Sequence, residues 1–163
     1  LELMNINLKE YLLNNTLTHE TKLFIIKNIL NGVEYLHNQD IIHCDLHPLN
    51  ILLNIADNKI TDIKIADFGL VIKKTKTNKC TNKQGLLMYI PNENEYSIKY
   101  DIYSLGIILF EIMEGYDTEM ERIININKFK NNEYQKKYSL FTKMINNIPS
   151  NRPLMSDIYK ELF

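Results

Sequence analysis

The chain has 163 residues, 45% of them hydrophobic, and a formal net charge of −1. This size and apolar content suit one domain with a buried core, and the balanced charge gives no electrostatic basis for binding nucleic acid or an anionic membrane. The longest apolar run, Leu105 to Phe110, is far too short to span a bilayer. Cys44 and Cys80 form no CxxC pair, which is typical of a reducing, cytoplasmic setting.

The first half of the chain predicts two helices and a small hairpin. A short helix is expected over residues 8–13, and Thr18 can cap a longer one with Glu20 in its first turn. Residues 51–53 and 62–65 are β-prone and flank a turn-like 56–58, which predicts a hairpin. An apolar stripe at helical spacing marks the buried face of the longer helix: Leu23, Ile26, Leu30 and Val33.

The second half is predicted to be mainly helical. Residues 70–90 are rich in Lys, Thr and Asn and read as an exposed loop. Residues 101–113 are apolar nearly all round, which indicates a buried helix. Further helices are expected near 117–128, 137–147 and 155–162. Since no linker-like stretch interrupts the sequence, we expect a single α+β domain, mainly α, over residues 1–163.

Two polar segments carry the candidate chemistry. Ile41 to Leu53 contains Asp45 and Asn50 around Pro48, which bars a continuous helix, and Asp67-Phe68-Gly69 follows the second β-prone run. Phosphoryl transfer needs a carboxylate to accept a hydroxyl proton, and hard oxygen ligands to hold Mg²⁺. Asp45 can be that carboxylate. Asn50 offers a neutral oxygen and Asp67 an anionic one.

These segments resemble the catalytic loop and the metal-binding aspartate of eukaryotic-type protein kinases. Further matches follow in the family's order along the chain. Residues 85–93 resemble the end of the activation loop, residues 101–106 the start of the buried organising helix, and residues 149–153 the late motif whose Arg pairs with a Glu. The form of the loop over residues 45–50 is similar to that of the Ser/Thr kinases.

The resemblance covers the whole chain but only the helical large lobe of the family's fold. Residues 1–4 resemble the hinge between lobes, so the small lobe, with its Gly-rich loop, strand lysine and glutamate, is expected before residue 1. The chain also begins at Leu1 rather than Met. Both features favour a partial kinase domain that is a fragment or an incomplete gene product.

Roles for individual residues are carried over from the resemblance. Asp45 is the expected catalytic base, with His47 beside it, while Asn50 and Asp67 are the Mg²⁺ ligands next to ATP. The backbone of Leu3 and Met4 would meet the adenine edge, and Leu52 would lie beneath it. The supporting residues implied are His43 and Phe68 in a packed column, Asp101 holding the loop backbone, and a buried ion pair of Glu93 with Arg152. His19 and His37 read as ordinary helix residues.

A finer resemblance concerns residues 101–111 followed by Thr118-Glu119-Met120-Glu121-Arg122. This combination is similar to the kinases of the alpha subunit of translation initiation factor two. In that group the helix with the Met-Glu-Arg segment helps to dock the substrate, so residues 117–128 are the expected docking element. Thr81 then occupies the position of a loop phosphothreonine.

Several positions depart from the family pattern. Cys44 replaces the Arg that pairs with a phosphorylated loop, a contact that a thiol cannot make, and Lys79 or Lys83 would have to substitute. His47 replaces a phosphate-neutralising Lys, and its cationic form is expected to be favoured by Asp45 and phosphate. Leu86 replaces a Thr near the base, and Pro91-Asn92 depart from Ala-Pro.

Two other functions compete with an active kinase. The departures and the missing small lobe favour an inactive kinase-like module that binds without catalysis, and nucleotide binding with and without Mg²⁺ discriminates. The run His43-x-Asp45-x-His47 would suit a metal hydrolase only with further ligands. The expected function is therefore a Ser/Thr protein kinase that uses ATP and Mg²⁺ on a protein substrate.

Overall fold

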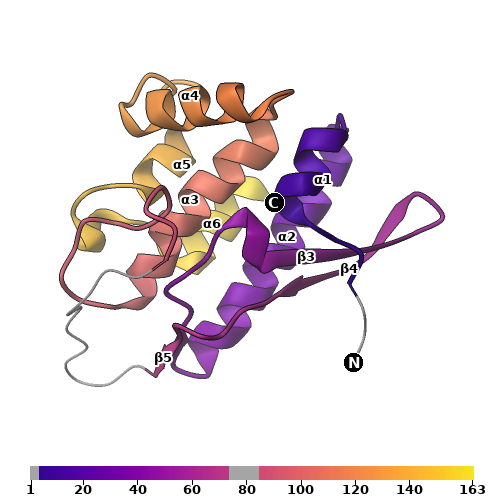
Figure 1. Cartoon of the computed structure of the whole chain (residues 1–163). Coiled ribbons are helices and arrows are strands. Elements are labelled where there is room, and N and C mark those ends of the chain that lie inside the picture. Colours follow the sequence, from indigo (N-terminus) through magenta and orange to yellow (C-terminus); the bar gives the residue numbers. More distant parts are fainter. Residues whose placement is uncertain (1–3, 74–84) are drawn as a thin grey trace.

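The computed structural model describes residues 4–73 and 85–163. A helical layer packs beside a small antiparallel sheet, and the hairpin of that sheet projects to one side (Figure 1). The elements in chain order are β1 (Ile6–Asn7), α1 (Leu8–Asn14), α2 (His19–Asn38), β2 (Ile41–Ile42), η1 (Pro48–Asn50), β3 (Ile51–Ala56), β4 (Lys59–Ile65), β5 (Ile72–Lys73), α3 (Ile98–Glu114), α4 (Glu119–Lys130), α5 (Ser139–Met144), η2 (Pro149–Asn151) and α6 (Met155–Leu162).

The first two helices begin at the caps that the sequence contains. The side chain of Asn7 accepts the Glu10 N–H at the start of α1, and the side chain of Thr18 accepts the Thr21 N–H at the start of α2. The buried face of α2 is wider than predicted, because Ile25, Ile29 and Leu36 are buried in addition to the predicted residues. Leu23, which was predicted to be on this face, is only half-buried. The residues that fill this face are Ile25, Ile26, Ile29, Leu30, Val33 and Leu36.

The predicted hairpin is present and longer than expected. β3 pairs antiparallel with β4, and β1 adds on the other side of β3, so that Asn7 lies opposite Leu52. Asp57 and Asn58 form the turn with φ of 50° and 58°. Short polar residues tolerate this left-handed conformation, which suits the twist of a tight hairpin. The hairpin is anchored where β4 packs against α2.

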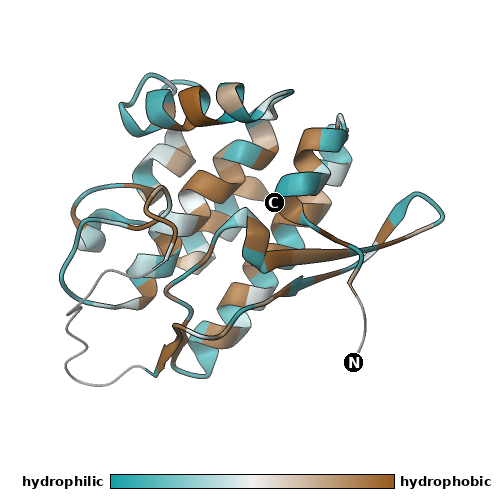
Figure 2. Cartoon of the chain, viewed as in Figure 1, coloured by the Kyte–Doolittle hydropathy of each residue, from teal (hydrophilic) through white to brown (hydrophobic). Residues whose placement is uncertain are grey.

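α3 forms the centre of the core, as its apolar sequence predicts. It packs against α2, α4 and α5, and every residue from Tyr100 to Ile112 is buried. Figure 2 shows hydrophobic colouring along α3 and along β3, with polar colouring concentrated at helix ends and loops. The mainly α class with a small hairpin is therefore confirmed.

The prediction of one exposed loop over residues 70–90 is wrong in two places. Ile72 and Lys73 form β5, which pairs with β2, and Tyr89 and Ile90 are buried. Both depend on partners distant in sequence, which local composition does not register. Residues 74–84 lie outside the described part of the chain. Within the described part, no helix combines the length and apolar character needed to cross a bilayer.

Candidate active site

A buried carboxylate organises the loop that follows β2. Asp101, in the first turn of α3, is fully buried. Its Oδ2 accepts the backbone N–H of His43 at 2.9 Å and its Oδ1 accepts that of Cys44 at 3.0 Å. Cys44 has a φ of 67°, a left-handed conformation that costs a non-glycine residue free energy. Asp101 thus holds a strained loop in one conformation.

His43 joins this loop to the segment that contains Asp67. Its ring Nε2 donates to the carbonyl of Ala66 at 3.0 Å, while its Nδ1 accepts the Asp45 N–H at 3.3 Å. The Phe68 ring lies 5.4 Å from the His43 ring, measured between centroids. Because both ring nitrogens already have partners, His43 is a packing residue and not a free metal ligand.

The carboxylate of Asp45 is held at the surface end of the loop, with 13% of its side chain exposed. The amide of Asn50 donates to its Oδ2 at 3.3 Å and to its backbone carbonyl at 3.0 Å. The N–H of Leu86 donates to its Oδ1 at 3.3 Å. Gly85 has a φ of 106° and approaches so closely that an added Cβ would overlap Oδ1 of Asp45.

His47 lies against Asp45, with its Nε2 3.5 Å from Oδ1. Burial lowers the pKa of His47, although the charge and hydrogen bond of Asp45 and the charge of Asp67 oppose the shift. Asp45 alone therefore does not raise the pKa of His47 above its ordinary value, and the predicted preference for the cationic form when phosphate is also present stays a prediction. The other ring nitrogen, Nδ1, is buried and has no hydrogen-bond partner among residues 4–73 and 85–163.

Asn50 and Asp67 offer oxygens of the kind that Mg²⁺ prefers. The two hydrogen bonds of the Asn50 side chain both use its nitrogen, so its amide oxygen makes no hydrogen bond within the described residues. Asp67 is exposed at a φ of 58°, with Oδ1 accepting the Gly69 N–H at 3.2 Å. Neutral and anionic oxygens beside Asp45 fit a hard cation that also binds phosphate. No group of three or more His, Cys, Asp or Glu in the described ranges is placed to hold a metal.

The expected nucleotide-binding residues are only partly within the described structure. Met4 is half-buried just before β1, and Leu52 is half-buried within β3. Leu3, and Thr81 with its neighbours Lys79 and Lys83, lie outside the described residues. Phe68 is 49% exposed, so the column of His43 and Phe68 is uncovered at its end.

Glu93 and Arg152 form an ion pair between the activation-loop end and the start of the last helical segment. Nη2 of Arg152 lies 2.6 Å from Oε2 of Glu93, and their side chains are 1% and 9% exposed. Arg152 also donates to the backbone carbonyls of Asn146 and Lys99. A guanidinium with all three nitrogens engaged fixes residues that are distant in sequence.

Two important groups escaped the sequence analysis. His37, expected to be an ordinary helix residue, donates a hydrogen bond from its ring Nε2 to Oδ2 of Asp101 at 2.8 Å. A histidine in the last turn of a helix gives no local sign of such a distant partner.

The second group is a buried polar cluster between α3, α4 and the activation-loop end. Nε of Arg122 lies 2.5 Å from Oε1 of Glu111, and Tyr89 donates to Oε2 of Glu111 at 2.6 Å while accepting from Nη2 of Arg122. Each of the three residues is at most 4% exposed. Arg122 was expected on a docking surface, but its side chain points into the protein.

Cys44, which stands where the resemblance places an Arg, is buried. Its side chain is 3% exposed and packs with Ile42, Ile90 and Tyr100 in a small apolar cluster. The site therefore presents no cation at residue 44 to a phosphorylated loop. The apolar cluster stabilises the loop by burial.

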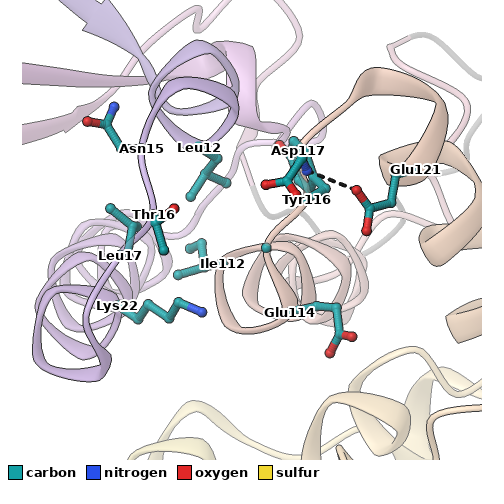
Figure 3. A pocket seen from close by; sticks show the side chains of 11 residues that line it. Leu12, Asn15, Thr16, Leu17, Lys22, Ile112, Glu114, Tyr116, Asp117 and Glu121 are labelled. Carbon is teal, nitrogen blue, oxygen red and sulfur yellow. Dashed lines mark hydrogen bonds between the residues drawn. The ribbon is translucent and has the colours of Figure 1, made fainter.

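A cavity of about 200 Å³ lies away from Asp45, between the end of α1 and the link from α3 to α4 (Figure 3). Two of the three carboxylates that line it, those of Glu114 and Glu121, already have hydrogen-bond partners. Oε2 of Glu121 accepts the Asp117 N–H at 2.9 Å, and Oε2 of Glu114 accepts from Lys137 and Tyr138. These contacts brace the link before α4 and leave little reason for a ligand there.

Comparisons with known proteins agree with this geometry. Residues 1–163 match the protein kinase domain family along their whole length. The interferon-induced, double-stranded RNA-activated protein kinase of Mus musculus is 32% identical over 95% of this chain and 32% of its own length. Eukaryotic translation initiation factor 2-alpha kinase 3 of Rattus norvegicus is 30% identical, over 86% of this chain and 14% of that protein. Eukaryotic translation initiation factor 2-alpha kinase 1 of Rattus norvegicus is 40% identical, over 63% of this chain and 18% of that protein. The chain thus spans about a third or less of the length of these relatives.

Proposed function

This chain belongs to the protein kinase family, and from that premise we propose that it is the catalytic lobe of a Ser/Thr kinase that phosphorylates protein hydroxyls. Protein kinases use ATP with Mg²⁺. The observation that carries the proposal is the fixed carboxylate of Asp45, which Asn50 and Leu86 orient from two sides. A positioned base of this kind is what hydroxyl phosphorylation requires.

Each residue of the site has a separate task in this proposal. Asp45 orients the acceptor hydroxyl and takes its proton. Asn50 and Asp67 would hold Mg²⁺, which when bound neutralises the phosphate oxygens. Asp101 keeps the loop in its strained conformation, and His43 links it to the Asp67 segment. His47 adds positive charge near Asp45 when it is protonated.

Phosphate positioning needs a second wall of the cleft. The 163 residues contain five glycines and no G-x-G-x-x-G run, so these residues provide only the lower half of the cleft, with Met4 and Leu52 near the adenine. We propose that residues 1–163 are the hinge and helical lobe of a partial kinase domain. An ATP-binding small lobe would complete the cleft and exclude water from it.

The test compares the chain alone with the chain joined behind the small lobe of a related kinase. Calorimetry should show weak or no ATP binding by the chain alone, no transfer to protein, and Mg²⁺-dependent binding and transfer by the joined form. Strong ATP-dependent transfer by the isolated, contaminant-free chain would contradict the proposed role of the small lobe.

An inactive binding module is the alternative. It is favoured by three departures from the family pattern. Cys44 removes the cation that pairs with a phosphorylated loop, His47 replaces a permanently charged Lys, and Leu86 removes a hydroxyl near the base. Mg²⁺-dependent nucleotide binding without transfer by the joined form would support this alternative. Transfer that depends on Asp45 would exclude it.

Two of these relatives are named as translation initiation factor 2-alpha kinases, which favours the alpha subunit of that factor as the substrate. We propose that the surface over residues 117–128 docks it. Met120 is 70% exposed there, with Ile123 and Ile124 beside it on α4, while Arg122 faces inward. This substrate implies a cytoplasmic location, and contacts with nucleic acid or membrane are not required.

A binding assay with the purified alpha subunit tests the docking surface. Met120→Glu should weaken binding to the joined form, because it places a charge in an apolar contact. Tyr35→Glu on α2 is the matched control, since Tyr35 is 67% exposed at a different element. Equal loss from both variants, or from neither, would argue against docking through α4.

A further inference from the structure

A cavity of about 500 Å³ lies where the end of α4 and the loop after it meet α3, α5 and the segment that follows α5. It shares no residue with the candidate active site. The side chains that line it are mainly amides and hydroxyls, together with two lysines, Lys130 and Lys143. No carboxylate is among these lining residues, so this part of the described structure offers positive charge and hydrogen-bond donors.

Lys130, the last residue of α4, carries a cation without a counter-charge. It is half-buried, and none of the described carboxylates pairs with it. Its Nζ donates to the carbonyl of Met88 at 3.1 Å and lies 5.7 Å from the centre of the Tyr103 ring. An ammonium group has three donors, so two are left for a ligand. Burial lowers the pKa of Lys130, and a bound anion would oppose that effect.

Tyr103, on α3, places a second donor at the cavity. The residue is only 7% exposed and its ring also lies 5.1 Å from Cζ of Arg152. Its hydroxyl lines the cavity and makes no hydrogen bond with another described residue. Burial raises the pKa of Tyr103, so the hydroxyl keeps its proton. A nearly buried donor without a partner costs free energy that an acceptor on a ligand would recover.

Asn146 and Lys143 add further donors. Oδ1 of Asn146 accepts the Ile148 N–H at 2.9 Å, which leaves its amide nitrogen for a ligand. Lys143 lies 3.2 Å from Oε1 of Glu161, but both side chains are largely exposed, and an exposed pair is readily exchanged for another partner. The surrounding sequence has the same sign, since residues 128–147 contain five lysines and one glutamate, a net charge of +4.

We propose that this cavity binds a phosphate monoester, with Lys130 as its main cationic contact and Tyr103 and Asn146 as neutral donors. A phosphate group brings three acceptor oxygens and a charge of about −1.5 to −2. These match cationic and neutral donors that come from three separate elements. A carboxylate has two oxygens and a single charge, so it would engage fewer of them. The site is apart from the proposed transfer chemistry and does not depend on it.

Calorimetry on the full chain, without ATP, tests the ligand class with three probes. These are glycerol phosphate, a capped alanine peptide with one phosphoserine, and the same peptide with glutamate in place of phosphoserine. Both phosphates should bind, and the glutamate peptide should bind about tenfold more weakly or worse. Tighter binding of the phosphopeptide than of glycerol phosphate would support the proposal with a protein as the source of the phosphate. Equal affinities would support it with a free phosphorylated molecule as the source.

NMR on the wild-type chain locates the bound phosphate without any substitution. The methyl signals of Ile145 and Ile148, which line the cavity, should shift on addition of either phosphate. Ile123 and Ile124 on α4 do not line it, and their signals should stay in place. Shifts that map to other residues would overturn the proposal.

Three variants measure the individual contacts. Lys130→Gln should weaken phosphate binding by about 10- to 100-fold, and Tyr103→Phe, which keeps the ring, by about 2- to 10-fold. Lys128→Gln is the matched control, because Lys128 is exposed on the same helix and does not line the cavity. It should change the affinity by less than about twofold, since exposed charges are screened by salt. Equal losses from Lys128→Gln and Lys130→Gln would mean diffuse attraction to a basic segment, and equal binding of the glutamate peptide would exclude phosphate selectivity; either result overturns the proposal.

Discussion

Nε of Arg122 lies 2.5 Å from Oε1 of Glu111, in the packed space between α4 and α3. This contact connects the helix proposed to dock the substrate with the helix that organises the core. Tyr89 completes the cluster from the activation-loop end. The cluster therefore joins α3, α4 and the segment of Tyr89 at one buried point.

The Glu111 cluster should make stability depend on pH. Burial raises the pKa of Glu111 from 4.5 to about 7, against the opposing effects of Arg122 and Tyr89. Between these two values the folded chain binds a proton that the unfolded chain does not, so the free energy of unfolding should fall as pH rises from 4.5 to about 7. The contribution is at most ~3 kcal/mol.

Urea denaturation across this pH window measures that contribution. Glu111→Gln should lose it, whatever the stability of the variant itself, because an amide does not titrate. The comparison isolates one group from the other carboxylates. Parallel pH profiles for the wild-type chain and the variant would show that Glu111 does not titrate in this range.

Gly85 and Gly115 make a matched pair for testing the position of Asp45. Both have positive φ, 106° and 74°, but an added Cβ overlaps Asp45 at Gly85 and meets nothing within 4 Å at Gly115. Gly115→Ala should therefore cost only backbone strain, ~1–2 kcal/mol of stability. Gly85→Ala should also displace the carboxylate and lower transfer by ~100-fold or more.

Transfer rates and denaturation midpoints of the two variants, in the form joined to a small lobe, decide this point. Equal activity of Gly85→Ala and Gly115→Ala would mean that the close approach of Gly85 does not set the geometry of the base.

His47 should titrate below its ordinary value of 6.5 in the free chain, because burial outweighs the attraction of Asp45. Removing that attraction with Asp45→Asn should lower the pKa further. Asp62→Asn, on β4 and 40% exposed, should leave it unchanged. NMR titration of the imidazole signals measures the pKa of His47 in the wild-type chain and in both variants. A His47 pKa above 6.5 in the wild-type chain would contradict burial as the dominant effect.

The rate of phosphate transfer should depend on the positive charge at position 47. A lysine remains protonated where His47 is neutral, so His47→Lys should transfer phosphate at least as fast as the wild type near pH ~8. It should also remove the pH dependence that His47 causes. A His47→Lys variant without activity at any pH would show that the position does not supply charge.

The sequence was most informative where chemistry or periodicity is local. The spacing of Asp45, Asn50 and Asp67 identified a candidate site whose members the structure places on adjoining segments, and the apolar run after Asp101 predicted a buried helix. The predicted cap at Thr18 also acts within one turn of chain.

What escaped prediction depends on partners far away in sequence. The His37–Asp101 contact joins residues 64 positions apart, and β5 exists only because β2 lies beside it. The inward direction of Arg122 is decided by Glu111 and Tyr89 and not by its own helix.

The most direct test of the account compares Asp45→Asn with Asp67→Ala in the joined form. Transfer to a protein hydroxyl and Mg²⁺-dependent ATP binding are both measured, with Asp62→Asn as the control. Asp45→Asn should lose nearly all transfer yet keep ATP binding, because the carboxylate acts on the acceptor. Asp67→Ala should lose Mg²⁺-dependent binding as well. Wild-type transfer in both variants would contradict the assignment of this site.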